Sequence, residues 1–308
     1  MAASDDGESI PRLSQLGLQQ EAWKIWTGFP PGRGETLPVP KLAYSGNNKD
    51  ALLAQGIATP ELFVYRPAEP NGIAALILPG GGYWALAING EGSDVAHRLT
   101  QAGVTCFVLV YRLPTEGWLK RATAPLQDAQ RAMRVIRLFS EAFRIDPAKL
   151  GVLGFSAGGH LAAALATCHS DVLYDTEDNA DLLSAKPAFA GLFYPVIELR
   201  LPYTNILTAY GLMGDAPTAA EIDALSPAMR VSPDTPPCFL VHAMDDDVVV
   251  VENSLVMLTS LRAQGIAAEA HLFQSGGHGF GLPADETSPA GRWPTLLIDW
   301  MMRVVSPL

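Results

Sequence analysis

Continuous apolar runs alternate with helix-spaced segments along most of the chain, beginning near Thr59. The runs that have the length and composition of strands are "ELFVYRP", "IAALILP", "VTCFVLVYR", "KLGVLGF", "AFAGLFYP", "PCFLVHA" and "AEAHLF". Several of them are apolar at nearly every position, which is typical of strands buried on both faces of a parallel sheet. Apolar residues at helical spacing predict helices over residues 93–102, 124–143, 157–167, 251–264 and 293–305.

This alternation over residues 59–308 predicts one α/β domain, a doubly wound and mostly parallel sheet with helices on both faces. Residues 1–58 are rich in Gly, Pro and Trp and have little periodicity, so we expect an irregular N-terminal arm packed on the core. Residues 199–230 interrupt the rhythm, which indicates a lid or an excursion over one edge of the sheet.

Composition narrows the possible partners. The chain has 308 residues, 48% of them hydrophobic, and a net charge of −11. This charge argues against nucleic acid and against an anionic membrane, because both favour a basic face. No window approaches the roughly 18 consecutive apolar residues of a membrane span. The opening "MAASDDGESI" is acidic and polar, so we expect no signal peptide in this chain; the compartment and the oligomeric state are not predicted.

The three cysteines are Cys106, Cys168 and Cys238, and each lies among apolar residues. Their positions lack the paired spacing of a zinc site or a redox motif. We therefore expect buried thiols that act as small hydrophobes, and no metal site.

The stretch "GVLGFSAGGHLAAALA" contains G-x-S-x-G, with Ser156 at its centre, between a predicted strand and a predicted helix. In that context the serine occupies a strained turn, with free backbone N–H groups at the helix start to stabilise an anion. The alternative is a serine that only caps the helix. We favour a catalytic nucleophile.

A nucleophilic serine needs a base, and the base needs an orienting carboxylate. Among the six histidines, His278 lies in the glycine-rich loop "QSGGHGFGLP" just after the last predicted strand. That position at a strand end favours His278 as the base. His160, close to Ser156 in sequence, falls on the predicted helix and is assigned to packing.

The carboxylate is expected between them in chain order, where the acidic run at residues 245–247 follows a buried strand. Mutual repulsion means that at most one of these three acids faces inward. We predict Asp246 in this role, with Asp245 as the alternative. A solvated turn that caps the next helix is the other interpretation of the run.

The stretch "LILPGGGYW" places three glycines at the end of another predicted strand. This is the position of the loop that supplies part of the oxyanion hole in such sheets, and glycines allow the close approach that a site requires. We predict the backbone N–H groups of Gly81, Gly82 and Ala157 as the donors to an oxyanion.

With these residues, the chain resembles an α/β-hydrolase, and more closely the acetyl xylan esterase-like and feruloyl-esterase-like group of bacterial esterases. The motifs that carry the resemblance are "W-x-G-x-P-P-G" at residues 26–32, "PGGGY", "EG" at 91–92, "YRLP", "DAQRAMRVIR", "GFSAGGHLAA", "VHAMDDDVVVVENS" and "GGHGFG". The resemblance covers nearly the whole chain and implies the α/β-hydrolase fold, with Ser156, Asp246 and His278 as the triad. It also implies cofactor-free removal of acyl groups, typically acetyl, from decorated sugars.

Two positions depart from this pattern. Pro79 precedes the glycines where lipase-like relatives carry histidine, so the HGGG signature is incomplete. Asp247 and Val250 stand where many relatives carry proline, which leaves the choice between Asp245 and Asp246 less secure.

The substrate is the least determined part of the prediction. Tyr83, Trp84 and Trp118 are expected on loops near the mouth of the site, where they stack on a sugar or pack under a lid. No apolar tunnel or helical lid is evident, which favours acetyl over fatty acyl esters on an oligosaccharide or another small molecule. Feruloyl or general carboxylesters are the alternative, followed by a serine peptidase and by a hydrolase fold that only binds.

Overall fold

The computed structural model describes residues 10–18, 20–45, 51–282 and 287–306, and within them a central sheet has the strand order β1-β4-β7-β5-β8-β9-β10-β11. The bounds are β1 Ala22–Lys24, β4 Glu61–Tyr65, β5 Ala74–Leu78, β7 Thr105–Val110, β8 Leu150–Phe155, β9 Ala190–Phe193, β10 Cys238–Ala243 and β11 Ala268–Phe273. Strands β1, β4 and β7 pair antiparallel, whereas all pairs from β7 to β11 are parallel. The predicted α/β class with a mostly parallel sheet is confirmed.

Each strand-like run of the sequence forms a strand of this sheet. Strands β5, β7, β8, β9 and β10 are buried at every position, which explains why their sequences do not alternate. The edge strand β11 is only partly buried. The parallel strands therefore bring their carboxyl ends to one edge of the sheet, where ligands bind in folds of this kind.

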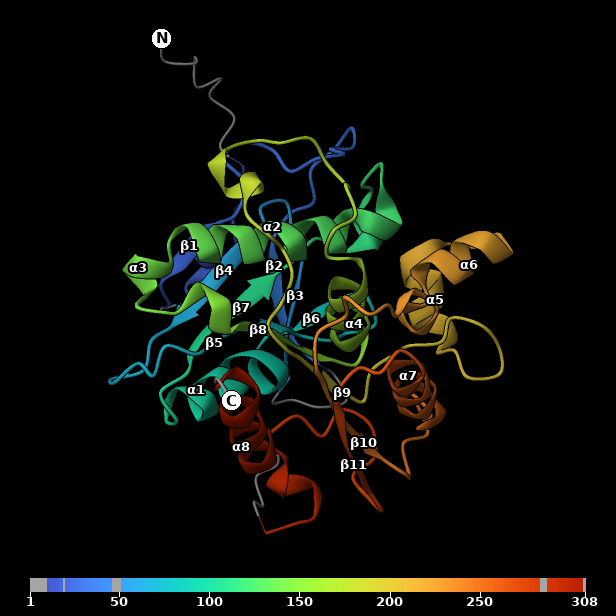
Figure 1. The fold of residues 1–308 in the computed structure, drawn as a ribbon. Coiled ribbons are helices and arrows are strands. Elements are labelled where there is room, and N and C mark those ends of the chain that lie inside the picture. The colour runs from blue at the N-terminus through green and yellow to red at the C-terminus, as the bar shows by residue number, and fades with distance from the viewer. Residues whose placement is uncertain (1–9, 19, 46–50, 283–286, 307–308) are drawn as a thin grey trace.

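Helices cover both faces of the sheet. The α-helices are α1 Asp94–Thr100, α2 Ala124–Leu138, α3 Ser140–Phe143, α4 Ala157–Cys168, α5 Ile206–Met213, α6 Ala219–Leu225, α7 Glu252–Ala263 and α8 Trp293–Val305. Figure 1 shows α1 and α8 together on one side and α2 and α4 on the other. The predicted helix over 124–143 is divided at Phe139, which leaves the helical conformation.

Short helical turns complete the connections. The 3₁₀ turns are η1 Leu13–Leu16, η3 Pro114–Glu116, η4 Arg121–Thr123, η5 Pro147–Lys149, η6 Asn179–Leu182, η7 Pro227–Arg230 and η8 Ala290–Arg292. One π-helical turn, η2 Asn89–Ser93, leads into α1. Such turns are rare and are frequent at functional sites.

The N-terminal segment is more regular than expected. Strand β1 joins the central sheet, and β2 Lys41–Tyr44, β3 Leu52–Gln55 and β6 Leu86–Ala87 form a small antiparallel sheet. Strands β1, β2 and β3, of three or four residues each, are too short to show a period in the sequence, so the expectation of an entirely irregular arm is corrected. The division of the chain at residue 58 stays a prediction.

Residues 199–230 contain α5, α6 and η7, which Figure 1 shows beside α4 and α7. All three cysteines are free and buried, as expected. Among the described residues, no helix is both long and apolar enough to cross a membrane.

Candidate active site

The strained turn expected at Ser156 lies between β8 and α4. Ser156 has φ 53° and ψ −118°, a conformation that L-residues rarely adopt. Its N–H donates to the Phe193 carbonyl (3.0 Å), and its own carbonyl accepts from the Val196 N–H (3.2 Å). A Cβ at Gly158 would lie 2.1 Å from the Leu78 carbonyl oxygen, so only glycine permits this approach of helix and strand.

The hydroxyl of Ser156 meets the imidazole of His278. Ser156 Oγ lies 2.9 Å from His278 Nε2, and His278 Nδ1 lies 2.8 Å from Asp246 Oδ2. Because an ionised carboxylate only accepts hydrogen bonds, Nδ1 carries the proton and Nε2 presents its lone pair to the hydroxyl. This tautomer is the one that a general base requires.

Asp246 is buried and accepts hydrogen bonds at both of its oxygens. The N–H groups of Val248 (3.0 Å) and Val249 (2.8 Å) donate to Oδ1, and His242 Nε2 lies 3.2 Å from Oδ2. Burial raises the pKa of Asp246, but the hydrogen bonds from His242 and His278 outweigh it and hold the pKa well below the ordinary aspartate value. The carboxylate is therefore ionised wherever His278 acts as a base.

The neighbouring acids have other surroundings. Asp245 is exposed, and its Oδ1 accepts from the N–H groups of Gly276 (2.9 Å) and Gly277 (2.8 Å). Asp247 is exposed as well. The structure thus brings Asp246, not Asp245, against His278, while Asp245 holds the backbone of the loop that carries the histidine.

The glycine loop after β5 has one occupied and two open N–H groups. The Gly80 N–H donates to Glu91 Oε2 (2.8 Å), whereas within the described residues those of Gly81 and Gly82 have no acceptor. Gly81 has φ 129°, which favours glycine. Ala157 is the first residue of α4, where N–H groups lack helical partners. The lack of acceptors for these N–H groups among the described residues is compatible with the predicted oxyanion hole, which stays a prediction.

A cavity of about 370 Å³ opens at these groups. It is lined by Gly81, Gly82, Trp84, Ala87, Glu91, Ser156, Asn205, Leu207, Thr208, Val248, Val249 and His278. Helix α5 supplies one wall, so part of the segment 199–230, for which we expected a lid or an excursion over one edge of the sheet, borders the site. Nothing in the sequence pattern of residues 199–230 revealed on which side of the serine they fold.

Comparison with known proteins shows the family of this chain. The family model BD-FAE matches residues 62–261, well over half of the chain. The chain belongs to the BD-FAE family of α/β-hydrolase esterases. The crystal structure of an acetyl ester-xyloside bifunctional hydrolase from Caldicellulosiruptor lactoaceticus is 32% identical, with a TM-score of 0.76, and covers 96% of this chain and 98% of that one.

Two curated relatives are longer proteins. The endo-1,4-beta-xylanase B of Butyrivibrio fibrisolvens is 35% identical over 74% of this chain, and the acetylxylan esterase of Xylanibacter ruminicola is 30% identical over 72%. The matched region spans only 35% and 44% of their respective lengths. This BD-FAE chain is therefore similar to one part of each.

Two of the three aromatic residues expected at the mouth are buried instead. Tyr83 is 1% exposed, with its hydroxyl 2.7 Å from His160 Nδ1, and Trp118 is buried with the Arg112 guanidinium 4.9 Å from its ring centre. Both expectations are corrected, because His160, 77 residues away, contacts Tyr83, and Arg112 packs against the Trp118 ring. Trp84 does line the cavity and is 40% exposed.

Three polar residues near the triad escaped the sequence analysis as functional candidates. Glu91 appeared only as part of a family motif, Tyr194 directly follows β9, and His242 belongs to β10. Tyr194 stands at a strand end, the signal that located the other residues. His242 contacts Asp246 from inside the fold, and no sequence signal marks such a contact.

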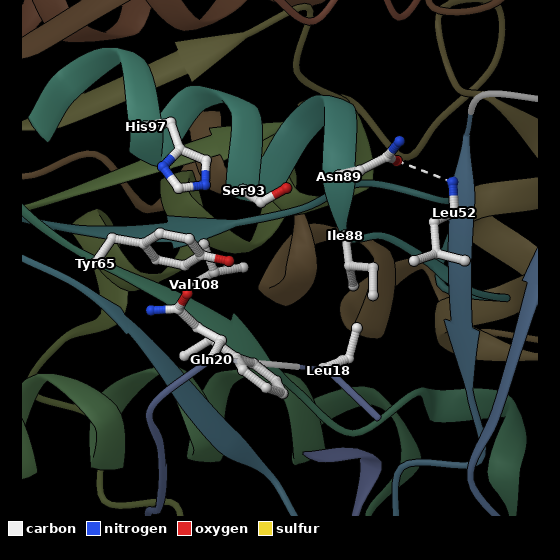
Figure 2. Close-up of a pocket in the computed structure, with 10 residues that line it drawn as sticks. Leu18, Gln20, Leu52, Tyr65, Ile88, Asn89, Ser93, His97 and Val108 are labelled. Carbon is white, nitrogen blue, oxygen red and sulfur yellow. Dashed lines mark hydrogen bonds between the residues drawn. The ribbon is translucent and has the colours of Figure 1, made fainter. Parts of the chain in front are cut away.

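A second cavity, of about 200 Å³, lies between β4, β7 and the segment from Ile88 to His97 (Figure 2). Its described lining includes none of the residues predicted for the site. Among the described residues, no group of three or more His, Cys, Asp or Glu is arranged to hold a metal ion.

Proposed function

We propose that this BD-FAE protein is a serine esterase that removes short acyl groups, above all acetyl, from plant-derived carbohydrates such as acetylated xylan oligosaccharides. The observation that carries the proposal is the 2.9 Å contact between Ser156 Oγ and His278 Nε2 at the wall of an open cavity. The relatives named as an acetylxylan esterase and an acetyl ester-xyloside hydrolase support the acetyl and sugar components.

In the first half of the reaction, Ser156 Oγ attacks the ester carbonyl carbon and its proton passes to His278 Nε2. The carbonyl oxygen becomes an oxyanion, which the N–H groups of Gly81, Gly82 and Ala157 stabilise. The carbon–oxygen bond to the sugar then breaks, and Nε2 returns the proton to the departing alkoxide. An acyl group remains on Ser156.

In the second half, water takes the place of the serine as nucleophile. His278 accepts a proton from water, the hydroxide adds to the acyl carbon, and the bond to Ser156 Oγ breaks as Nε2 reprotonates it. Asp246 holds the imidazole tautomer and stabilises the imidazolium in both halves. These steps use no cofactor and no metal.

The test compares Ser156→Ala with Ser184→Ala, a change at an exposed serine whose Oγ accepts only a local bond from the Lys186 N–H. Release of acetate from acetylated xylan oligosaccharides is the measurement. We expect Ser156→Ala to lower kcat by roughly 10⁶-fold, to residual turnover, because the nucleophile acts as a unit with its base. Ser184→Ala is expected to retain the activity, and equal activity of both variants would contradict the proposal.

Feruloyl esters are the second candidate, because a cavity of about 370 Å³ has room for more than an acetyl group and a sugar edge. The same panel therefore contains methyl ferulate and a peptide amide. Faster turnover of the ferulate would reassign the acyl specificity, and cleavage of the amide would indicate a peptidase. Absence of turnover, together with no labelling of Ser156 by a fluorophosphonate, would indicate a binding protein.

A further inference from the structure

A continuous chain of hydrogen bonds joins the glycine loop to the histidine loop behind the catalytic serine. The Gly80 N–H donates to Glu91 Oε2 (2.8 Å), and Tyr194 Oη donates to Glu91 Oε1 (2.9 Å). The Gly281 N–H in turn donates to Tyr194 Oη (3.0 Å). Glu91 and Tyr194 are both buried.

The direction of every proton in this chain is determined by its two ends. Backbone N–H groups can only donate, so Gly281 occupies a lone pair of Tyr194 and Gly80 occupies Glu91 Oε2. The Tyr194 hydroxyl proton therefore points to Glu91 Oε1, and both carboxylate oxygens act as acceptors. An ionised Glu91 accepts both of these hydrogen bonds, one at each oxygen.

We infer that Glu91 is a second carboxylate of the site, a positioning residue that ties the glycine loop to the histidine loop and places a negative charge beside His278. The inference rests on the proposed function. Glu91 and His278 line the same cavity as Ser156. A Cβ at Gly80 would lie 2.7 Å from Glu91 Oε2 and 2.9 Å from Ser156 Cβ, so the carboxylate is packed directly behind the nucleophile.

The turn that carries Glu91 is fixed from its other side. Asn89 Oδ1 accepts the Leu52 N–H of β3 (2.9 Å), the contact drawn in Figure 2. Tyr194 is held as well, since its ring packs on His278 and Phe280 with centroid distances of 5.2 and 4.7 Å. The carboxylate therefore stands between two anchored elements, which is what a positioning residue requires.

Several titratable groups face this pair. His278 contacts Asp246, Ser156 and the Tyr194 ring, and the charge of Glu91 acts on it. His242 acts on His278 through Asp246. Glu91 faces Tyr194, His278 and Tyr111. Burial raises the pKa of Glu91, and the bonds from Gly80 and Tyr194 and the charge on His278 offset only part of that rise. Of the two carboxylates that act on His278, Glu91 alone also contacts the glycine loop.

The test measures the rate at which a fluorophosphonate labels Ser156, as a function of pH, in wild type, Glu91→Gln and Glu116→Gln. Labelling depends on the serine and its base and not on the natural ester. Glu116 is the matched control, because it also accepts two backbone N–H groups, from Gly56 and Ile57, but lies outside the cavity.

In Glu91→Gln we expect slower labelling, by about 10²-fold, because both loops lose their shared anchor. We also expect the acidic limb of the curve of labelling rate against pH to move to lower pH by roughly one unit in Glu91→Gln. The reason is that the His278 imidazolium loses a nearby negative charge. Glu116→Gln is expected to keep the limb where it is in wild type. A limb that stays in place in Glu91→Gln, or moves equally in Glu116→Gln, overturns the inference.

Tyr194→Phe is the second test variant, for the case that Glu91→Gln does not fold. It removes the link between the loops but retains the charge, so labelling is expected to slow by about tenfold while the acidic limb stays in place. Labelling of Tyr194→Phe at the wild-type rate would contradict the role of Tyr194 in linking the glycine loop to the histidine loop. Wild-type protein that is not labelled at all overturns the proposed function itself, and this inference with it, so the two failures are distinguishable.

Discussion

The cavity at Ser156 has two walls that differ in how their side chains are held. The hydrogen-bonded wall consists of Ser156, Glu91 and His278, which are bonded to Tyr194 and Asp246 behind them. The apolar wall consists of Trp84 and Leu207, and Tyr210 stacks on Trp84. On the first wall every side chain is buried or partly buried and bonded to a neighbour, whereas Trp84 and Leu207 of the second wall and the stacked Tyr210 are 40%, 69% and 43% exposed.

The difference follows from what each wall does in the proposed reaction. Proton transfer requires atoms held within a few tenths of an ångström, and shared hydrogen bonds supply that order before substrate arrives. Recognition of a sugar requires apolar surface that is still accessible. Trp84 and Tyr210 stack at 5.8 Å with their rings 7° apart, so this surface is ordered by ring contact and by one hydrogen bond from Trp84 Nε1 to the Leu207 carbonyl (3.1 Å).

The largest effect is expected beside the hydrogen-bonded wall, between two adjacent aspartates. Asp246→Asn places an amide NH₂ against His278 Nδ1 and stabilises the wrong imidazole tautomer, so we expect kcat to fall by about 10⁴-fold. Asp245→Asn keeps a carbonyl oxygen for the Gly276 and Gly277 N–H groups, and we expect less than about a tenfold loss. Steady-state hydrolysis of 4-nitrophenyl acetate measures both.

Comparable losses in the two variants would contradict this division. They would mean that the loop backbone held by Asp245, and not the imidazole contact, limits the reaction. Thermal unfolding of each variant is the control, because Asp246→Asn also leaves a donor against His242 Nε2 inside the fold.

The catalytic triad is the part of the site that could be predicted from the sequence, whereas Glu91 and Tyr194 beside it were not predicted. Ser156, Asp246 and His278 each follow a strand of the parallel sheet, and parallel strands end at one edge. The order of the residues along the chain and the glycines around Ser156 and His278 then reduced the number of candidate catalytic residues. Between Asp245 and Asp246, however, only the direction of the side chains decides, and that depends on the turn after β10.

The apolar wall could not be predicted in the same way. Whether an aromatic ring is buried depends on contacts that local periodicity does not reveal, such as Arg112 against Trp118 and His160, 77 residues away, beside Tyr83. The place of α5 depends on contacts such as the bond from Arg121 to the Gly211 carbonyl. The local periodicity of apolar residues does not predict such contacts.

An effect of intermediate size, on stability, is expected at His160, which joins the end of α6 to Tyr83. Its Nε2 lies 2.8 Å from the Leu225 carbonyl at the end of α6, and its Nδ1 lies 2.7 Å from Tyr83 Oη. Burial lowers the pKa of His160 from 6.5 to about 4, against the opposing hydrogen bond to Leu225. At pH values between about 4 and 6.5, His160 therefore binds a proton in the unfolded chain but not in the folded chain.

Stability contributed by a neutral His160 is therefore complete above pH 6.5 and is lost as the pH falls toward 4. The total loss in the free energy of unfolding is about 3 kcal/mol. We expect urea unfolding to show a smaller acid loss in His160→Gln than in wild type. His97→Gln, a change at an exposed histidine, is the control, and an acid loss unchanged by His160→Gln would show that other groups cause it.

The smallest effect is expected on the apolar wall. Trp84→Ala removes the ring that lines the cavity, so we expect KM for an acetylated xylo-oligosaccharide to rise by about three- to tenfold, the loss of one stacking contact. KM for 4-nitrophenyl acetate, which has no sugar ring, is expected to change less. Trp84→Phe keeps a ring but loses the bond to the Leu207 carbonyl, and recovery of KM in that variant would assign the effect to stacking. An equal rise for both esters would instead show that Trp84 only supports α5, and that the two walls do not divide chemistry from recognition.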